Sequence, residues 1–464
     1  MNEQNPTLYP LTAAQKLHFY SLKYCPYKQL LNIGTSLTIL EDVDFSILKE
    51  SIYEAYARSE AMRIRFRYGE DGELYQYVAE KETRDIEFFE FSHWQLCHAE
   101  AEMNRWTRVP FERCDSPMNR VVMISMPGGY KGIYLLVDHM TMDSSAIIVF
   151  MVDVIQLYCQ RKYGMDAPKP LTSYIEQIKK DLEYEAGSPA KKRDEAFWKE
   201  FLEQPEPIFC DISGPKQLEL ERERTGNPNT RAARVTSDDV LARHEIFHLE
   251  RHPADVLMNF CRDNRVPMVA LILLALRTQI SRMNGGEEDV SIMLPIARRG
   301  NKSEKKSGGT RVHFFPCRTI IGRETTFREA LSIIQKNQMS LYRHANYDPV
   351  AFLAQRRERF HNEPGQSYEC MSLTYQPLSM TAAPEELSHI GYQSHWYPNG
   401  VAANALYLTV MHQGLDEGMD FYFEYQTGRV TEGELEKLYY YVCRIMFQGV
   451  KDPEQTMGEI MDLV

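Results

Sequence analysis

The feature that most constrains this chain is a strand that leads directly into a helix through a short polar turn. Residues 132–137, Gly-Ile-Tyr-Leu-Leu-Val, form an apolar run with β-branched and aromatic residues, which is typical of a buried strand. The run stops at Asp138 and His139. After Asp143, the serines at 144–145 can cap a helix whose apolar residues recur at helical spacing. The pattern predicts a core strand with a histidine at its end and a carboxylate just before the next helix.

His139 is the first candidate for a catalytic group. A strand end holds a side chain rigidly, and an imidazole can take up a proton near neutral pH. Asp143, four residues on, can hold the turn in shape by pairing with a cation. The pattern His-x-x-x-Asp also begins at His344 and His412, and about one chance match is expected. Only the first match follows a buried strand and opens a helix, so context selects His139, with a satisfied structural histidine as the open alternative.

The length and the order of the elements predict an α/β protein with two lobes. A chain of 464 residues is long enough for two or three domains. Both halves mix strands with helices, and we expect the lobes at 1–180 and 181–464. Residues 205–239 are polar, rich in proline and glycine and poor in periodicity, so we expect a linker there.

The composition of the chain argues against some classes of partner and favours one cellular location. The formal charge of 53 − 65 = −12 argues against a nucleic-acid partner. The nine cysteines show no paired short spacing, which fits reduced thiols and a cytoplasmic location. The N-terminus is polar and unlike a secretory signal. The longest apolar run, 268–276, is too short to span a bilayer, so no membrane partner is expected.

Other recognisable chemistry finds little support in the sequence. His244, His248 and His252 repeat every four residues, which suggests a metal site on a helix. However, residues 245–249 have the pattern of a strand, where residues four apart lie about 13 Å apart, too far for one ion. We therefore expect no metal site. The sequence also lacks a phosphate-binding glycine loop and a Gly-x-Ser-x-Gly nucleophile elbow.

Six stretches resemble, in order and spacing, the motifs of the condensation domains of nonribosomal peptide synthetases. Together they cover nearly the whole chain. Residues 138–144 are similar to the family's His-His-x-x-x-Asp-Gly motif. The others are 10–15 (Ser-x-Ala-Gln), 58–66 (Arg-His-Glu-x-Leu-Arg-x-x-Phe), 309–318 (Gly-x-Phe-Val-Asn-x-x-Pro-Leu-Arg), 344–352 (Asp-x-Pro-Phe) and the closing strands near 406–409 and 423–425.

The resemblance implies two chloramphenicol-acetyltransferase-like lobes in a V, with an active-site tunnel between them. It implies acyl transfer from a thioester, usually on the phosphopantetheine arm of a carrier protein, to an amine or hydroxyl. That arm is the only cofactor implied, and none is bound permanently. Because no adenylation or carrier segment follows, we expect a stand-alone enzyme of secondary metabolism that works with an acyl- or peptidyl-carrier protein and a small-molecule acceptor.

The resemblance also assigns roles to residues. The second histidine of the motif, here His139, is the catalytic one, and Asp143 is mainly structural and pairs with an arginine, for which Arg298 is the match. The sequence departs from the family where Asp138 replaces the first histidine, Ser144 replaces the glycine, and Arg311 and His313 replace Phe and Asn. The candidates for the substrate tunnel are Asp138, Ser144, Arg63 and His313.

The main hypothesis is a stand-alone condensation-type acyltransferase that forms an amide or an ester, with His139 as general base or positioning group. One alternative is a catalytically silent module that binds a carrier protein. A second is an alcohol O-acyltransferase that uses a coenzyme A thioester. Two basic runs, residues 298–306 and 191–193, are candidate surfaces for an acidic carrier, and we favour the first.

Overall fold

The computed structural model describes residues 6–82, 84–376, 392–412 and 418–464, and their contacts group into two α/β units. The prediction of two α/β lobes is confirmed. Unit 1 comprises the described residues of Met1–Lys191, Ala297–Val312 and Met380–Val401, and unit 2 the rest. The first change of unit thus falls after Lys191 rather than after residue 180, and two later segments return to unit 1.

Unit 1 is built on a five-stranded sheet with the order β14-β2-β7-β6-β5. Neighbouring strands are antiparallel except for β5 and β6, which are parallel. A small sheet, β1-β4-β3, stands beside it. The strands of unit 1 are β1 (Tyr9–Pro10), β2 (Asn32–Ile39), β3 (Ile64–Tyr68), β4 (Leu74–Val78), β5 (Glu87–Glu90), β6 (Asn119–Ser125), β7 (Lys131–Asp138) and β14 (Tyr392–Tyr397).

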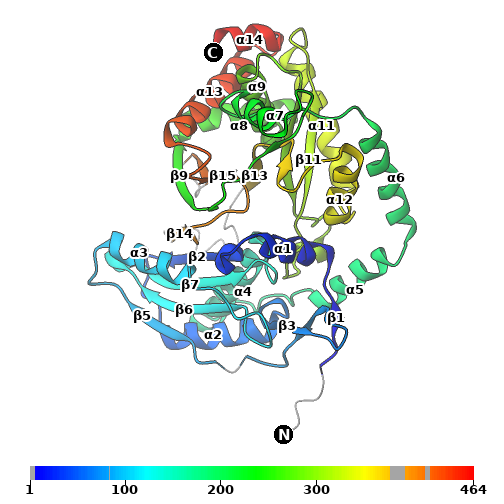
Figure 1. Ribbon diagram of the computed structural model, residues 1–464. Helices are drawn as coiled ribbons and strands as arrows, with labels where there is room; N and C mark the ends of the chain where they lie inside the picture. Colours follow the sequence, from blue (N-terminus) through cyan, green and yellow to red (C-terminus); the bar gives the residue numbers. More distant parts are fainter. Residues whose placement is uncertain (1–5, 83, 377–391, 413–417) are drawn as a thin grey trace. The chain divides into compact units, whose positions relative to one another are not determined.

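Helices cover both faces of the sheet in unit 1 (Figure 1). Ile133 and Leu135 of β7 share a core cluster with residues of α2 and α4, whereas Tyr134 and Leu136 pack with residues of α3. Burial on both faces explains why the sequence of β7 is almost continuously apolar. The helices of unit 1 are α1 (Ala13–Tyr24), α2 (Phe45–Arg58), α3 (Leu96–Thr107), α4 (Ser144–Tyr163), α5 (Tyr174–Glu185) and α10 (Lys302–Lys305), with 3-10 turns η1 (Lys28–Leu31), η2 (Ala61–Arg63) and η3 (Pro127–Gly129).

Unit 2 has a six-stranded sheet with the order β11-β10-β13-β15-β16-β9. The pairs β10–β13 and β13–β15 are parallel and the others antiparallel. A two-stranded ladder, β12-β8, is separate. The strands of unit 2 are β8 (Ala233–Arg234), β9 (Ala242–Leu249), β10 (Asp289–Ile296), β11 (His313–Ile320), β12 (Gln366–Ser367), β13 (Ser372–Gln376), β15 (Leu406–His412) and β16 (Met419–Gln426).

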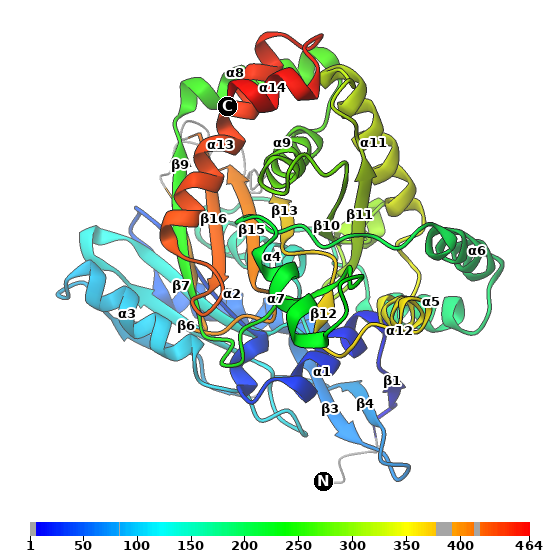
Figure 2. The same ribbon diagram turned by 45° about the horizontal axis from the view of Figure 1, so that its top comes forward.

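The apolar helix α9 is the centre of the core in unit 2. It packs against α8, α11, α13 and α14 and against β10 and β13 (Figure 2). Among the described residues, no single helix is long and apolar enough to cross a membrane; α8 and α9 meet that test only as a pair bent by 112°. The helices of unit 2 are α6 (Pro189–Glu203, whose first three residues fall in unit 1), α7 (Lys216–Thr225), α8 (Arg251–Asn264), α9 (Met268–Met283), α11 (Phe327–Arg343), α12 (Pro349–Phe360), α13 (Glu432–Lys451) and α14 (Met457–Leu463).

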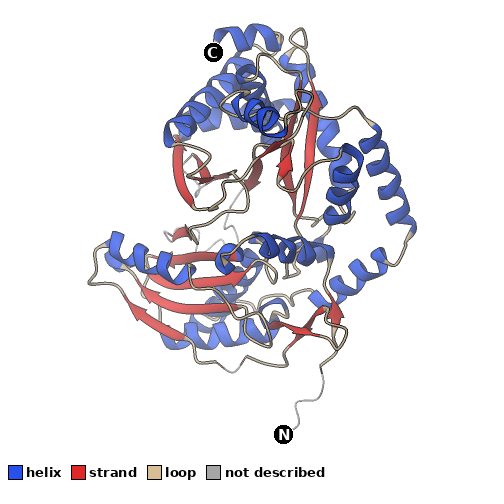
Figure 3. Cartoon of the chain, viewed as in Figure 1, coloured by secondary structure: helices blue, strands red, loops and turns tan. Residues whose placement is uncertain are grey.

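Residues 205–239 do not form the linker that their composition predicts. They contain α7 and β8 (Figure 3), and their apolar side chains, such as Phe209 and Leu218, belong to the core of unit 2. The prolines and glycines lie at the turns between these short elements, so low periodicity does not mean a lack of packing here. Just before this segment the chain forms two helices, α5 and α6, separated near Gly187, whose φ is 107°.

Candidate active site

The turn after β7 is locked by Asp138. Its fully buried carboxylate accepts a hydrogen bond from the main-chain N–H of Met140 at 2.9 Å and pairs with Arg113 at 2.5 Å. Its carbonyl oxygen accepts bonds from the N–H and the hydroxyl of Thr141. Burial raises the pKa of Asp138, and Arg113 opposes that shift. Asp138 therefore shapes the turn, and its predicted place among the tunnel residues is corrected to a structural role.

His139 follows at the end of the strand, as predicted. Its main-chain N–H donates to the carbonyl of Leu31 at 2.7 Å, which fixes the backbone. The side chain is partly exposed, but Nδ1 is buried and makes no hydrogen bond of normal geometry to the described residues. Burial lowers the pKa of His139, while its own main-chain carbonyl and the carboxylates of Asp143 and Asp138 act in the opposite direction. A lowered pKa keeps the imidazole neutral at neutral pH, which is the form that can accept a proton.

Asp143 joins the turn to α4. One carboxylate oxygen accepts the N–H of Ala146, so Asp143 itself is the helix N-cap, rather than the serines that follow it. The carboxylate also accepts the N–H of Arg311 at 2.9 Å and pairs with Arg299 at 2.9 Å. The side chains of Asp143 and Arg299 are 5% and 6% exposed. This set of bonds supports the structural reading of Asp143 and leaves little of the carboxylate for a reactant.

The arginine that pairs with Asp143 is Arg299 and not the predicted Arg298. Arg298 has a φ of 53° and pairs with Asp181 on α5 at 2.8 Å. Because β10 has ended at Ile296, strand alternation no longer decides where these side chains point. Arg299 also donates to the main-chain carbonyls of residues 304, 307 and 309, so it holds the loop that carries α10.

The remaining predicted tunnel residues have different positions. Arg63 donates to four main-chain carbonyls, two of them in the last turn of α2, which gives it a structural role, and its place in a substrate tunnel stays a prediction. His313 begins β11 in unit 2, where its Nδ1 lies 2.9 Å from the carbonyl of Ala345. Ser144 is the first residue of α4, next to Asp143, and is half-buried. Of the predicted site residues, Asp138, His139, Asp143 and Ser144 are the ones that the turn brings together.

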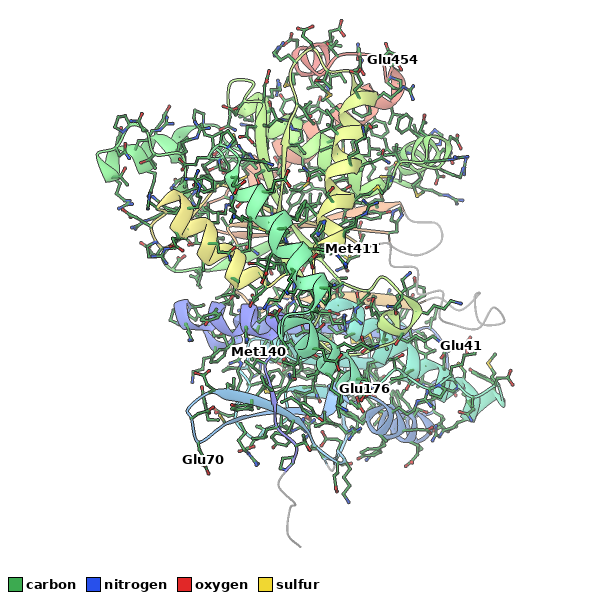
Figure 4. The ribbon with its side chains drawn as sticks, turned by 90° about the vertical axis from the view of Figure 1, so that its right-hand side faces the viewer. Glu41, Glu70, Met140, Glu176, Met411 and Glu454 are labelled. Atoms are coloured by element: carbon green, nitrogen blue, oxygen red, sulfur yellow. The ribbon has the colours of Figure 1, made fainter. Side chains whose placement is uncertain are left out.

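The structure adds His18 to this region. Its imidazole, on α1, stacks on that of His139 with the ring centroids 4.0 Å apart and an interplanar angle of 29°. Figure 4 labels Met140, whose carbonyl accepts a hydrogen bond from Gln15 of the same helix. The sequence offers no pattern that links residue 18 to residue 139, although Gln15 and His18 share one helix face by their spacing.

Two other features of the described residues lie apart from this turn. An apolar pocket of about 100 Å³ is lined by Lys131 and Ile133 of β7 and by residues of β2, α2 and α4, so it lies at the opposite end of β7 from His139. His244 and His248 lie on β9, as the strand pattern predicts, and pair with Glu424 and Asp420. No group of three or more metal-ligating side chains is poised to hold an ion anywhere in the described part of the chain.

Comparison with known proteins identifies the family to which this chain is similar. The model of the condensation domain matches residues 5–463. Surfactin synthase subunit 1 of Bacillus subtilis (strain 168) is 23% identical over 98% of this chain, and the dimodular nonribosomal peptide synthase of the same organism is also 23% identical over 98%. The chain spans only 12% and 19% of the length of those two proteins.

Solved structures share the fold. The first condensation domain of the calcium-dependent antibiotic synthetase, with a substrate analogue, has a TM-score of 0.79 at 16% identity, covering 98% of this chain and 99% of its own. The starter condensation domain of rhizomide synthetase, in complex with C8-CoA, has a TM-score of 0.80 at 18% identity and covers 97% of both chains. VibH, a condensation enzyme of nonribosomal peptide synthesis, has a TM-score of 0.72 at 16% identity, covering 97% of this chain and 98% of its own. With its fold of two chloramphenicol-acetyltransferase-like lobes and a family match across nearly its whole length, the chain belongs to the condensation-domain family.

Proposed function

We propose that this chain is a condensation-type acyltransferase in which His139 acts on the attacking nucleophile. The observation that carries the proposal is an imidazole on a rigid turn, with Nδ1 buried and the residue partly exposed. Burial lowers the pKa of His139, which favours the neutral form that can accept a proton. Because Nδ1 is buried, Nε2 is the ring nitrogen that remains for a reactant. The membership in the condensation-domain family supports the same chemistry.

The proposed reaction moves an acyl or aminoacyl group from a thioester to an amine or hydroxyl. The nucleophile attacks the thioester carbonyl, a C–N or C–O bond forms and the C–S bond breaks. Nε2 of His139 takes the proton of the nucleophile and gives it to the departing thiolate, so the imidazole returns to its neutral form. The donor is proposed to be held on the phosphopantetheine arm of a carrier protein. A coenzyme A thioester is the second candidate, because a starter condensation domain of the same fold was solved with C8-CoA.

The test compares three donors with the purified chain: a carrier-bound acyl thioester, the matching coenzyme A thioester and a small free thioester. We expect amide or ester product from the carrier-bound donor. Product from coenzyme A alone would favour an alcohol O-acyltransferase. Carrier binding without product from any donor would favour a catalytically silent module.

His139→Ala is expected to lower the rate of transfer by about 10²–10⁴-fold, the range for loss of a general base. The midpoint of thermal unfolding should change little, because Nδ1 makes no hydrogen bond of normal geometry to the described residues. His98→Ala, an exposed histidine on α3, is the matched control and should keep full activity. Full activity of His139→Ala would reject the catalytic assignment.

A further inference from the structure

The imidazole of His18 is a buried polar group with no evident structural use. The residue is 6% exposed, and its Nε2 is buried without a hydrogen-bond partner among the described residues. Buried polar groups are almost always hydrogen-bonded, and each exception calls for an explanation. The ring contact with His139 is the feature of His18 that offers one.

Helix α1 holds His18 in register with the turn. The helix begins with a capping box in which Thr12 and Gln15 bond one another's main chain. The side-chain amide of Gln15 also donates to the carbonyl of Met140, the residue after His139, at 3.3 Å. Gln15 and His18 lie on the same face of α1 because they are three residues apart. The hydrogen bond from Gln15 to Met140 therefore holds α1, which carries His18, against the turn that carries His139.

The two carboxylates near the rings of His18 and His139 are each paired with an arginine. Asp138 pairs with Arg113, and Asp143 pairs with Arg299. Burial holds the pKa of His18 well below its usual value, and a positive charge on His139 would lower it further. His18 thus stays neutral while His139 gains and loses a proton.

We propose that His18 is a positioning residue for His139: its neutral ring covers one face of the His139 imidazole, fixes the orientation of that ring and keeps water from that face. The role in turnover rests on the proposed function, whereas the effect on the ring of His139 does not. A proton taken up by His139 would then lie against a neutral aromatic face rather than against a second cation.

The experiment compares His18→Ala with His18→Phe in the full chain, and His98→Phe is the control for loss of a histidine. Histidine labelled with ¹³C and ¹⁵N reports the pKa and the tautomer of His139 by NMR without any substrate. Burial is the largest cause of the lowered pKa of His139, so removal of the ring in His18→Ala should raise that pKa toward about 6.5. The acid limb of the kcat profile should move upward with it, and kcat should fall about 10–100-fold with little change in KM.

His18→Phe keeps a flat ring and should restore both the pKa and the kcat profile. If His18→Ala does not fold, His18→Leu replaces it, because leucine fills the space without a flat face. The kcat of His18→Leu should then be lowered, and that of His18→Phe should be close to the value of the unchanged chain. The proposal would be overturned by an unchanged pKa of His139 in His18→Ala, by equal kcat values of His18→Leu and His18→Phe, or by failure of His18→Phe to restore kcat. If the chain transfers no acyl group at all, the NMR titration still decides the effect of His18 on His139.

Discussion

At the scale of single residues, Asp143 carries more of the local structure than His139 does. It accepts bonds from Arg299, from the N–H of Arg311 and from the first turn of α4. Removing the carboxylate would leave the buried guanidinium of Arg299 unpaired, which costs about 3–5 kcal/mol. Asp143→Ala should therefore lower the free energy of unfolding by that amount, far more than His139→Ala.

A double-mutant cycle of Asp143→Ala with Arg299→Ala should give a coupling of about 0.5–3 kcal/mol. The matched cycle with Arg298→Ala should give almost none, and the reverse result would restore Arg298 as the partner.

What the sequence could predict at this scale depends on how far apart the partners lie in the chain. His139 and Asp143 were predictable because a strand, a turn and a helix follow one another without interruption. The arginine was missed by one position because Arg298 adopts a positive φ beyond the end of β10. Arg63 resembled a motif residue, yet its guanidinium is used by main-chain carbonyls that no side-chain pattern reveals. His18 was missed because its contact with His139 joins residues from distant elements.

At the scale of elements, the segment from Ala297 to Val312 belongs to unit 1 although β10 and β11, on either side, belong to unit 2. Gly309 in this segment lies against Tyr174, the first residue of α5: its φ is 85°, and an added Cβ would overlap the ring of Tyr174. Gly309→Ala should cost about 1–3 kcal/mol for the overlap and about 1–2 kcal/mol for the left-handed backbone. Gly300→Ala in the same segment is the control, because its added Cβ would lie 3.7 Å from the nearest atom. Chemical denaturation measures both, and equal stability of the two variants would contradict the close packing at Gly309.

At the scale of the whole molecule, net charge bears on the proposed carrier. The formal charge of −12 should oppose the approach of an acidic carrier protein, so docking would need a local basic surface. Fewer charges of the basic run at 298–306 are exposed in the structure than the sequence alone suggests. The side chains of Arg298 and Arg299 are 4% and 6% exposed and are paired with carboxylates. The exposed charges that remain are Lys302, Lys305 and Lys306 on and beside α10.

Reversing those three lysines to glutamate should slow transfer from a carrier-bound thioester and make the residual rate less sensitive to salt, because the attraction that steers the carrier is removed. Transfer from a small free thioester should be unchanged, since His139 and the paired arginines are untouched. Reversal of the exposed Lys192, Arg193 and Lys199 on α6 makes the same change in net charge and is the matched control. The measurement is a pair of rate constants, one for each donor. Equal losses with both donors would mean that the segment shapes the site rather than binding a carrier. No loss with either donor would leave a coenzyme A thioester as the better candidate, because its approach would not depend on a protein-docking surface.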